Sequence, residues 1–377
     1  MVYITTRQAP MYRQVTIEEL LTADPNKSYL ISTNVSNTRT VELERVPMRL
    51  ARACDVPNLV SRLTAFNDAT KELREAERKS LYRTFKIPKK SGGMRTINEP
   101  NPELMTYLRL LKSILENDFG ALYNTSAFAY VKKRNALRSL QRHQANESRW
   151  YSKFDFHDFF GSTTLEFVMS MLGMIYPFSE FMMVPARKKV LETALELGFL
   201  DGGLPQGTPL SPTLTNIVMI PFDFRLTKKL RQKDPSFVYT RYADDLTITS
   251  KYDFKVEEIE ELVLDVLKEL NAPFTLNTEK TRYGSTAGSN WNLGLMVNKD
   301  NEITIGAKRK REFKCALHNY IRDKNEGNKI DRDDINTILG QYSYYRMVER
   351  AKIDAIVDTF NKKYNIDIIS MMRKEVA

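Results

Sequence analysis

The sequence has very few of the residues that build disulfide frameworks and zinc sites. Its 377 residues include two cysteines, Cys54 and Cys315, and three histidines, His143, His157 and His318. The two thiols lack the spacing of metal ligands, and the histidines are scattered along the chain. These shortages exclude a disulfide-rich secreted domain and argue against a zinc site.

Long apolar segments are also missing. No run of residues is long and apolar enough to span a bilayer. Residues 1–7 lack the apolar stretch that forms the centre of a signal peptide. We therefore expect a cytoplasmic protein in a reducing environment, with no membrane among its partners.

The composition is that of a globular protein with a basic surface. Hydrophobic residues make up 42% of the chain and aromatic residues 10%, which excludes a disordered protein. A chain of this length has room for two or three domains. Lysine and arginine exceed aspartate and glutamate by 57 to 47, so the net charge is +10. This excess favours a polyanionic partner, nucleic acid before a membrane surface.

Two adjacent acids, Asp244 and Asp245, have apolar or β-branched residues on both sides. Val238 and Tyr239 precede them and residues 246–248 follow, which predicts a hairpin with the acids at its tip. Two neighbouring carboxylates repel each other unless a divalent cation neutralises them. Asp-Asp is also a common turn dipeptide, so the pair alone leaves a plain turn open.

A third acid, Asp155, ends a predicted strand that begins near residue 151. A single aspartate in this position is usually a cap or a turn residue. Two-metal phosphoryl transfer, however, needs acids that bridge two Mg²⁺ ions about 3.5–4 Å apart. Asp155 therefore matters for function if the fold brings it to Asp244.

Residues 82–97 predict a hairpin with a Ser-Gly-Gly turn. Lys89, Lys90 and Arg95 would cluster near its tip, where they suit phosphate oxygens. The plainer explanation is a basic hairpin that is simply solvated.

Residues 204–217 predict a loop rich in glycine and proline that opens a long helix, with Ser211 as the N-cap. Such a junction lets a ligand approach the backbone, although it can also be an ordinary connection. Amphipathic helices are predicted at about 102–117 and 257–270, and a short strand at 274–276. From about residue 305 the pattern is helical and begins with a basic run, Lys-Arg-Lys-Arg.

Taken in order, these segments resemble a reverse transcriptase of the prokaryotic group that contains retron, group II intron and phage-defence (abortive-infection-type) enzymes. Tyr-Ala-Asp-Asp at 242–245 resembles the catalytic hairpin of that family. Phe-Asp-Phe-His-Asp-Phe-Phe at 154–160 resembles its first acidic motif, and Leu-Pro-Gln-Gly-Thr-Pro-Leu-Ser-Pro at 204–212 its nucleotide-binding loop.

Three further segments resemble the fingers, the primer grip and the thumb of the family. They are Ile-Pro-Lys-Lys-Ser-Gly-Gly-Met-Arg-Thr-Ile at 87–97, Asn-Leu-Gly-Leu at 292–295 and Leu-Gly-Gln-Tyr-Ser-Tyr at 339–344. The resemblance covers about residues 80–350.

The resemblance implies an α+β chain with the right-hand polymerase fold: fingers, a ferredoxin-like palm and a compact helical thumb. The alternation of strands and helices fits such a palm. We expect a partly helical N-terminal extension at 1–80, fingers at 81–150, the palm with part of the fingers at 151–300 and the thumb at 301–377.

The implied activity is that of an RNA-directed DNA polymerase, which adds dNTPs to a primer 3′-hydroxyl by two-metal phosphoryl transfer. The implied cofactor is a pair of Mg²⁺ ions, for which Mn²⁺ can substitute. The implied metal-binding residues are Asp155, Phe156, Asp244 and Asp245. The implied catalytic residues are Asp155, Asp244, Asp245 and Lys280, where Lys280 matches a family lysine near the phosphates and is a candidate proton donor.

The resemblance also assigns the nucleotide site. Lysine or arginine of the fingers would clamp the triphosphate, backbone N–H groups after the first acid would face it, and Phe160 would be a steric gate that favours dNTPs over rNTPs. The implied substrate-binding residues are Lys89, Lys90, Arg95, Asp158, Phe159, Phe160, Gln206 and Gly207. The implied primer grip consists of Asn292, Leu293, Gly294 and Leu295.

The implied partners are an RNA template, which can be a dedicated noncoding RNA, a DNA or RNA primer, and dNTPs. The N-terminal region is a candidate site for a protein partner or a second copy. Many retron enzymes carry Val-Thr-Gly where this chain has Asn-Leu-Gly, which favours a stand-alone defence enzyme or an unclassified bacterial enzyme over a retron. The expected setting is a bacterial anti-phage defence or retroelement system. The alternatives are a template-independent or protein-primed DNA polymerase and a non-catalytic RNA-binding scaffold.

Overall fold

A computed structural model describes residues 56–88, 92–119, 123–288 and 292–376, together with the backbone of three short strands near the N-terminus. These are β1 (Tyr3–Thr5), β2 (Arg13–Gln14) and β3 (Leu30–Ser32), which form a small sheet in the order β2-β1-β3. No helix within the described ranges is long and apolar enough to cross a membrane.

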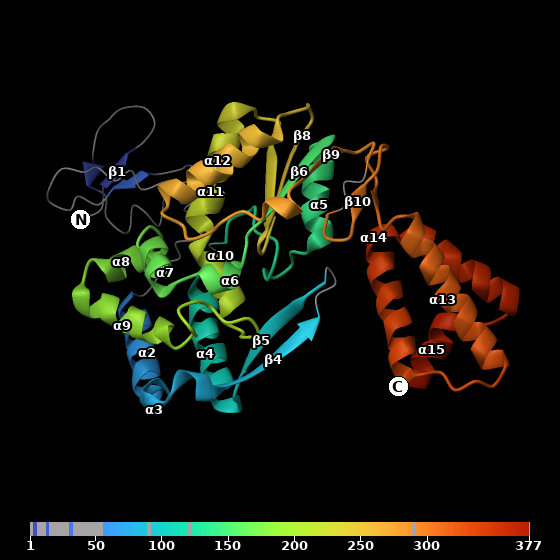
Figure 1. Cartoon of the computed structure of the whole chain (residues 1–377), viewed down its shortest axis with the longest axis horizontal. Helices are drawn as coiled ribbons and strands as arrows, with labels where there is room; N and C mark the ends of the chain where they lie inside the picture. The colour runs from blue at the N-terminus through green and yellow to red at the C-terminus, as the bar shows by residue number, and fades with distance from the viewer. Residues whose placement is uncertain are drawn as a thin grey trace.

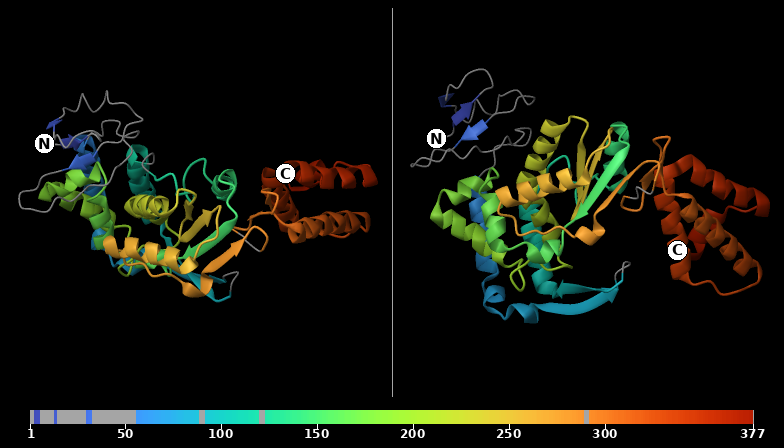
Figure 2. Two further views of the ribbon diagram at one scale, coloured as in Figure 1. Left: turned by 90° about the horizontal axis from the view of Figure 1, so that it is seen from above. Right: turned by 45° about the horizontal axis from the view of Figure 1, so that its top comes forward.

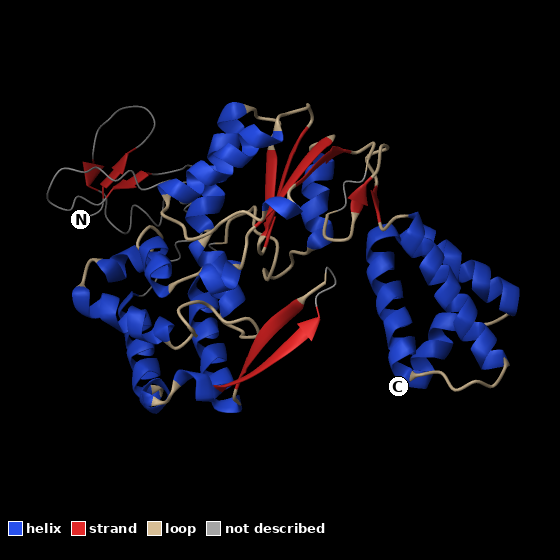
Figure 3. Ribbon diagram, viewed as in Figure 1, coloured by secondary structure: helices blue, strands red, loops and turns tan. Residues whose placement is uncertain are grey.

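The centre of the fold is an antiparallel sheet of four strands in the order β7-β8-β6-β9 (Figures 1 and 3). Residues with β-branched and aromatic side chains dominate its strands, as is typical of a pleated, half-buried surface. The strands are β6 (Trp150–Asp155), β7 (Val238–Tyr242), β8 (Asp245–Ser250) and β9 (Arg282–Ser285).

One face of this sheet packs against helices. Because side chains alternate along a strand, Phe154, Tyr239, Leu246 and Ile248 all point to this face, and all are buried in the larger hydrophobic core. Figure 1 shows α11 and α12 beside the sheet. The helices are α10 (Ser211–Val218), α11 (Ile220–Lys233) and α12 (Val256–Glu269).

The larger core continues from the sheet into a helical region. From this region the hairpin of β4 (Tyr82–Pro88) and β5 (Met94–Pro100) extends toward the C-terminal helices (Figure 1). The remaining helices here are α2 (Val56–Ala69), α3 (Lys71–Glu75), η2 (Arg78–Leu81), α4 (Pro102–Phe119), α6 (Phe159–Ser162), α7 (Leu165–Leu172), α8 (Phe178–Met182) and α9 (Pro185–Glu196).

The second core joins the opposite face of the sheet to the C-terminal helices. Tyr151 from that face packs with Leu140 of α5 (Ala136–Ala145) and with the hairpin of β10 (Met296–Val297) and β11 (Ile303–Thr304). Figure 2 shows the last helices as a lobe beside the rest of the chain. They are α13 (Ala307–Asn325), α14 (Arg332–Tyr364) and α15 (Ile368–Val376).

Three local predictions are wrong. The helix that opens at residue 211 is short, because α10 ends at Val218 and α11 begins at Ile220. Ser211 is its first helical residue and not its N-cap, and the Ser211 hydroxyl donates to the Pro205 carbonyl at 2.8 Å. The strand predicted at 274–276 is reduced to one isolated bridge between Leu276 and Phe156.

Candidate active site

The structure brings the three acids together at one end of the sheet. Asp155 is the last residue of β6, and it lies directly opposite Asp245, the first residue of β8. Asp244 lies in the two-residue turn that joins β7 to β8, as the sequence pattern predicts. Ala243, the other turn residue, has a left-handed backbone with φ of 60°, which a tight hairpin turn demands.

The acids are partly withdrawn from water and repel one another. Burial, together with the charges of Asp244 and Asp155, raises the pKa of Asp245 to about 7. Burial also raises the pKa of Asp244, with Asp155 adding to the effect. Asp155 is only 7% exposed. A group of carboxylates with this character has a strong need for a cation.

Lys280 supplies one such cation. It ends the short helix η3 (Thr278–Lys280), and its Nζ lies 2.6 Å from Oδ1 of Asp155. The hydrogen bond to Asp155 raises the pKa of Lys280, so the side chain stays charged. The structure therefore places the predicted catalytic lysine against the first acid.

The acids fit divalent cations in their chemistry, because carboxylate oxygens are the ligands that Mg²⁺ takes. Within the residues that the structure describes, no three Asp, Glu, His or Cys side chains are already arranged to hold a metal ion. The ion pair between Lys280 and Asp155 occupies one of the oxygens concerned. Asp155 nevertheless lies directly opposite Asp245 in the sheet, so a shared cation would relieve the repulsion between these carboxylates.

The predicted metal residue Phe156 can contribute only through its backbone. Its ring is buried and packs against the rings of Phe159, Phe222 and Phe274. Its N–H donates to the carbonyl of Asp244 at 3.3 Å, which connects the strand of the first acid to the turn of the second.

A cavity of about 310 Å³ borders the acids. Asp155, Asp245 and Lys280 line one part of it, and Asn292 and Leu293 line another. The cavity therefore joins the predicted catalytic residues to the predicted primer grip.

The predicted primer grip is a tight turn. Asn292 and Leu295 exchange backbone hydrogen bonds of 2.6 and 2.8 Å, and Leu293 and Gly294 between them have φ of 51° and 79°. The buried side-chain amide of Asn292 donates to the Thr247 hydroxyl on β8 at 2.9 Å. This bond holds the turn two residues along the strand from Asp245.

Arg95, on β5, interacts electrostatically with Asp244 from the hairpin of β4 and β5. Its charge lowers the pKa of Asp244, against the larger effect of burial. Tyr130, which the sequence analysis missed, interacts with both Asp244 and Arg95. Its side chain is 55% exposed and its φ is 57°. Lys89 and Lys90 lie outside the described residues.

The nucleotide-binding loop is docked onto the same hairpin. The N–H of Asn98 on β5 donates to the Gln206 carbonyl at 2.8 Å. Gly207 has φ of 109°, and a Cβ there would lie 2.8 Å from a methyl group of Ile97, so the close packing requires glycine. Gln206 is half-buried and Gly207 is exposed.

The residues after the first acid differ in exposure. Asp158 is exposed and has a left-handed backbone with φ of 42°. Phe159 is buried, with its ring stacked on Phe156. Phe160 is half-buried, and its carbonyl accepts from the Leu204 N–H at 3.0 Å, which puts it beside the nucleotide-binding loop.

A buried ion pair supports the turn that carries Asp244. Nε and Nη2 of Arg241 each lie 2.8 Å from an oxygen of Asp223 on α11, and the Tyr239 hydroxyl donates to the same carboxylate at 2.7 Å. Nη1 of Arg241 donates to Asn216 at 3.1 Å and to the Ala243 carbonyl at 3.2 Å. The sequence analysis missed this pair, although an arginine on the core-facing side of a strand signals a buried acid.

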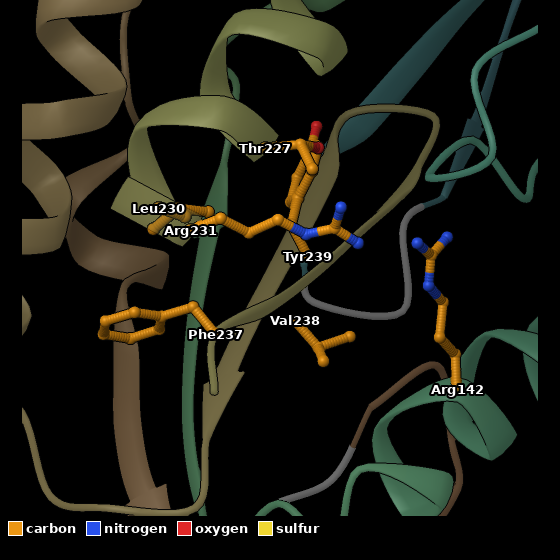
Figure 4. Close-up of a pocket in the computed structure, with 7 residues that line it drawn as sticks. All are labelled: Arg142, Thr227, Leu230, Arg231, Phe237, Val238 and Tyr239. Atoms are coloured by element: carbon orange, nitrogen blue, oxygen red, sulfur yellow. The ribbon is translucent and has the colours of Figure 1, made fainter. Parts of the chain in front are cut away.

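A second cavity, of about 50 Å³, lies at the other end of β7 from the acids. Figure 4 shows Arg142 and Arg231 approaching it from α5 and α11, beside Val238 and Tyr239. Burial lowers the pKa of Arg142, and the charge of Arg231 lowers it further. The cavity has room for little more than water, so it is not the candidate active site.

The sequence predicts no catalytic or metal-binding role for His143, Lys153, Cys54 or Cys315. His143 is fully buried between the hydroxyls of Thr240 and Thr249, at 2.8 Å from each, and burial lowers its pKa to about 3. Burial likewise lowers the pKa of Lys153, which lines the larger cavity, to about 8. Cys315 is a free, exposed thiol on α13, and Cys54 lies outside the described residues.

Two acids on adjoining strands of an antiparallel sheet and a third in the next turn, with a basic hairpin and a helical lobe around them, define a nucleic-acid polymerase of the right-hand type. The chain belongs to the reverse transcriptase family: residues 87–314 match the family described as reverse transcriptase (RNA-dependent DNA polymerase). The predicted α+β polymerase fold and the predicted RNA-directed DNA polymerase activity are thereby confirmed.

Curated relatives agree with this assignment. The retron Ec73 reverse transcriptase of Escherichia coli is 29% identical over 275 residues, which cover 70% of this chain and 82% of the relative. The retron Ec83 reverse transcriptase of the same organism is 27% identical over 301 residues, which cover 78% and 90%. Among solved structures, a telomerase from Candida albicans matches at 11% identity with a TM-score of 0.44, covering 92% of this chain and 68% of that one.

Proposed function

We propose that this chain is a reverse transcriptase of the retron type, which copies an RNA template by adding dNTPs to a primer 3′-hydroxyl. The observation that carries the proposal is the register of the sheet, which sets Asp155 opposite Asp245 and beside Asp244. Five retron reverse transcriptases are among its relatives. They favour the retron type over the stand-alone defence enzyme that the Asn-Leu-Gly turn suggests. Roles in anti-phage defence, a dedicated noncoding RNA and a cytoplasmic location stay predictions.

Asp155, Asp244, Asp245 and the carbonyl of Phe156 would hold two divalent cations, Mg²⁺ or Mn²⁺ in its place. When bound, these ions supply activation of the primer hydroxyl and neutralise charge on the triphosphate. A cation on Asp155 would compete with Lys280 for Oδ1 of Asp155, because Nζ of Lys280 lies 2.6 Å from that oxygen. The ammonium group of Lys280 would hold a proton for the leaving group near the substrate phosphates.

The remaining assignments follow from placement. Arg95 lies on the Asp244 side of the site, which suits the triphosphate. Phe160 lies beside the nucleotide-binding loop, which suits a gate against the 2′-hydroxyl. The N–H groups of Asp158 and Phe159, with Gln206 and Gly207, would complete this side, and Lys89 and Lys90 stay predictions.

The turn at 292–295 would position the primer end, on the Asp245 side. We assign the fingers to residues 81–150, the palm to 151–300 and the thumb to 301–377, with 1–80 as the N-terminal extension. The existence of two hydrophobic cores supports a separate thumb, because the side chains of the C-terminal helices pack in the second core and not in the larger one.

Primer extension on an RNA template tests the proposal. We expect dNTP incorporation that depends on Mg²⁺ and falls by at least about 10²-fold in Asp244→Ala plus Asp245→Ala, because metal ions supply several kcal/mol of stabilisation. Asp300→Asn, which changes an exposed acid of the β10–β11 turn, is the matched control. Full activity in the double variant would end the proposal.

The same products separate the alternatives. Sequences that do not copy the template would indicate template-independent synthesis, and DNA that is released only by a protease would indicate protein priming. Tight RNA binding without incorporation would indicate a scaffold.

A further inference from the structure

A second row of side chains lies beside the acids on the same face of the sheet. Lys153 of β6 is two residues before Asp155, and it pairs in register with Thr247 of β8 on one side and Arg282 of β9 on the other. Side chains two residues apart share a face and are separated by about 6.6–6.8 Å along the strand. The row of Thr247, Lys153 and Arg282 therefore adjoins the acids.

All three residues line the cavity of about 310 Å³ that Asp155 and Asp245 also line. Lys153 is half-buried, and within the described part of the chain its ammonium group has no hydrogen bond or ion pair, although it interacts electrostatically with Asp245. Nη1 of Arg282 donates to the carbonyls of Glu279 and Thr281, which fixes the guanidinium at the cavity wall. A partly desolvated, unpaired cation favours an anionic partner.

The position of the row indicates which part of the substrate its cations would face. Asn292 of the primer-grip turn donates to Thr247, so the row lies between the acids and that turn. The charge of Arg95 acts on Asp244 instead, and Arg95 lies on β5, the strand onto which the nucleotide-binding loop is docked. The row is therefore on the primer side and not on the triphosphate side.

We propose that Lys153 and Arg282 form a subsite for a phosphodiester of the primer strand, the linkage that joins its last two nucleotides. The inference rests on the proposed function, which places the primer 3′-hydroxyl at the acids. The sugar and phosphate of one nucleotide span a distance of the same order as the separation of the two rows. Two cations around one singly charged phosphate fix the register of the strand without reading its sequence.

The test compares a normal primer with one that carries an uncharged methylphosphonate at the terminal linkage. For the wild type we expect the KM for primer–template to rise about ten- to hundredfold on the uncharged linkage, as expected for a lost hydrogen bond to a charged group. Lys153→Met should show the same rise on the normal primer and no further rise on the modified one. Lys153→Arg should restore most of the affinity, and the KM for dNTP should stay unchanged.

Three controls keep the result interpretable. A methylphosphonate several linkages upstream should affect wild type and Lys153→Met equally. The slope of log affinity against log salt should fall by about 1 in Lys153→Met, as for one lost phosphate contact. Arg282→Gln, at an exposed position, repeats the test if Lys153→Met fails to fold.

Additive losses in Lys153→Met on the modified primer would overturn the inference, because the lysine and the linkage would then act independently. A lower kcat with an unchanged KM for primer–template would also overturn it, since Lys153 would then only neutralise Asp245. In either case the wild type still extends a normal primer, whereas failure of the proposed function would show as a wild type that extends none.

Discussion

Replacing Arg241 by methionine should destabilise the protein strongly, because it leaves a carboxylate buried without its cation. The side chains of Arg241 and Asp223 are both 0% exposed, and two bonds of 2.8 Å join them. Arg241→Met keeps the apolar volume in the core but removes every donor. Asp223 keeps only the hydrogen bond from Tyr239.

The structure sets the size of the effect. Removing one partner of a buried ion pair costs about 3–5 kcal/mol. The Ala243 carbonyl and the Asn216 amide oxygen also lose a donor, which keeps the expected loss toward the upper part of this range. A domain has a total stability of about 5–15 kcal/mol, so the variant should unfold at a much lower denaturant concentration.

Urea unfolding followed by circular dichroism measures the loss, with Arg83→Met as the matched control. Arg83 pairs with Glu99 at 3.1 Å, but the two side chains are 77% and 50% exposed, so its removal should cost less than about 1 kcal/mol. Arg241→Met combined with Asp223→Leu should recover much of the stability, because an apolar pair can replace a buried ion pair. The double variant should still polymerise slowly, since the Ala243 carbonyl remains without its donor. An Arg241→Met protein as stable as the control would refute this reasoning.

Three further predictions concern other parts of the chain. The folded state holds His143 neutral with a pKa of about 3, below the ordinary value of about 6.5, so the unfolded state binds the proton first as the pH falls. The free energy of unfolding is therefore full above pH 6.5 and falls by about 2 kcal/mol at pH 5. Urea titrations of the wild type and of His143→Asn at both pH values should show this loss in the wild type alone. Phe160→Ala should raise rNTP incorporation relative to dNTP, measured by competition on one template, and unchanged discrimination would remove Phe160 as the gate. Glu349→Ala should lower the free energy of unfolding by about 1–3 kcal/mol, because the Glu349 carboxylate lies where α14 kinks and accepts from Lys310 at 2.6 Å and from the Ile305 N–H at 2.9 Å. The control Glu326→Ala, which replaces an exposed acid of the same lobe, should leave the free energy of unfolding unchanged.

The sequence was sufficient for the hairpin that carries Asp244 and Asp245, because alternating β-branched residues and a tight turn are local signals. The register of Asp155 against Asp245 could not be predicted from one sequence. Strands of a sheet pair over long distances along the chain, and a shift of one residue would turn Asp155 to the other face. The prediction that Asp155 lies near Asp244 and Asp245 came from the family resemblance and not from the pattern of apolar and polar residues.

The errors in the helix after residue 210 have a physical cause. Apolar residues continue at helical spacing through Met219, so the pattern does not show where α10 ends and α11 begins. Pro221 lies in the first turn of α11, where proline is tolerated. In the sequence, the start of this new helix therefore cannot be distinguished from a continuation of α10. The Ser211 hydroxyl resembles a cap in the sequence, but in the structure it closes the preceding loop.

The residues that sequence reasoning missed show how the site is held rigid. The side-chain amide of Asn216 donates to the Ala129 carbonyl at 2.8 Å, while its oxygen accepts from Arg241. Through these bonds α10, the segment next to Tyr130 and the turn of Asp244 become one unit beneath the sheet. The row of Lys153 and Arg282 lies on the opposite face. A polymerase must hold the primer end still while each nucleotide is added. In the proposed function the face with the acids would bind the primer strand, and the bonds on the other face would keep the turn of Asp244 fixed during that step.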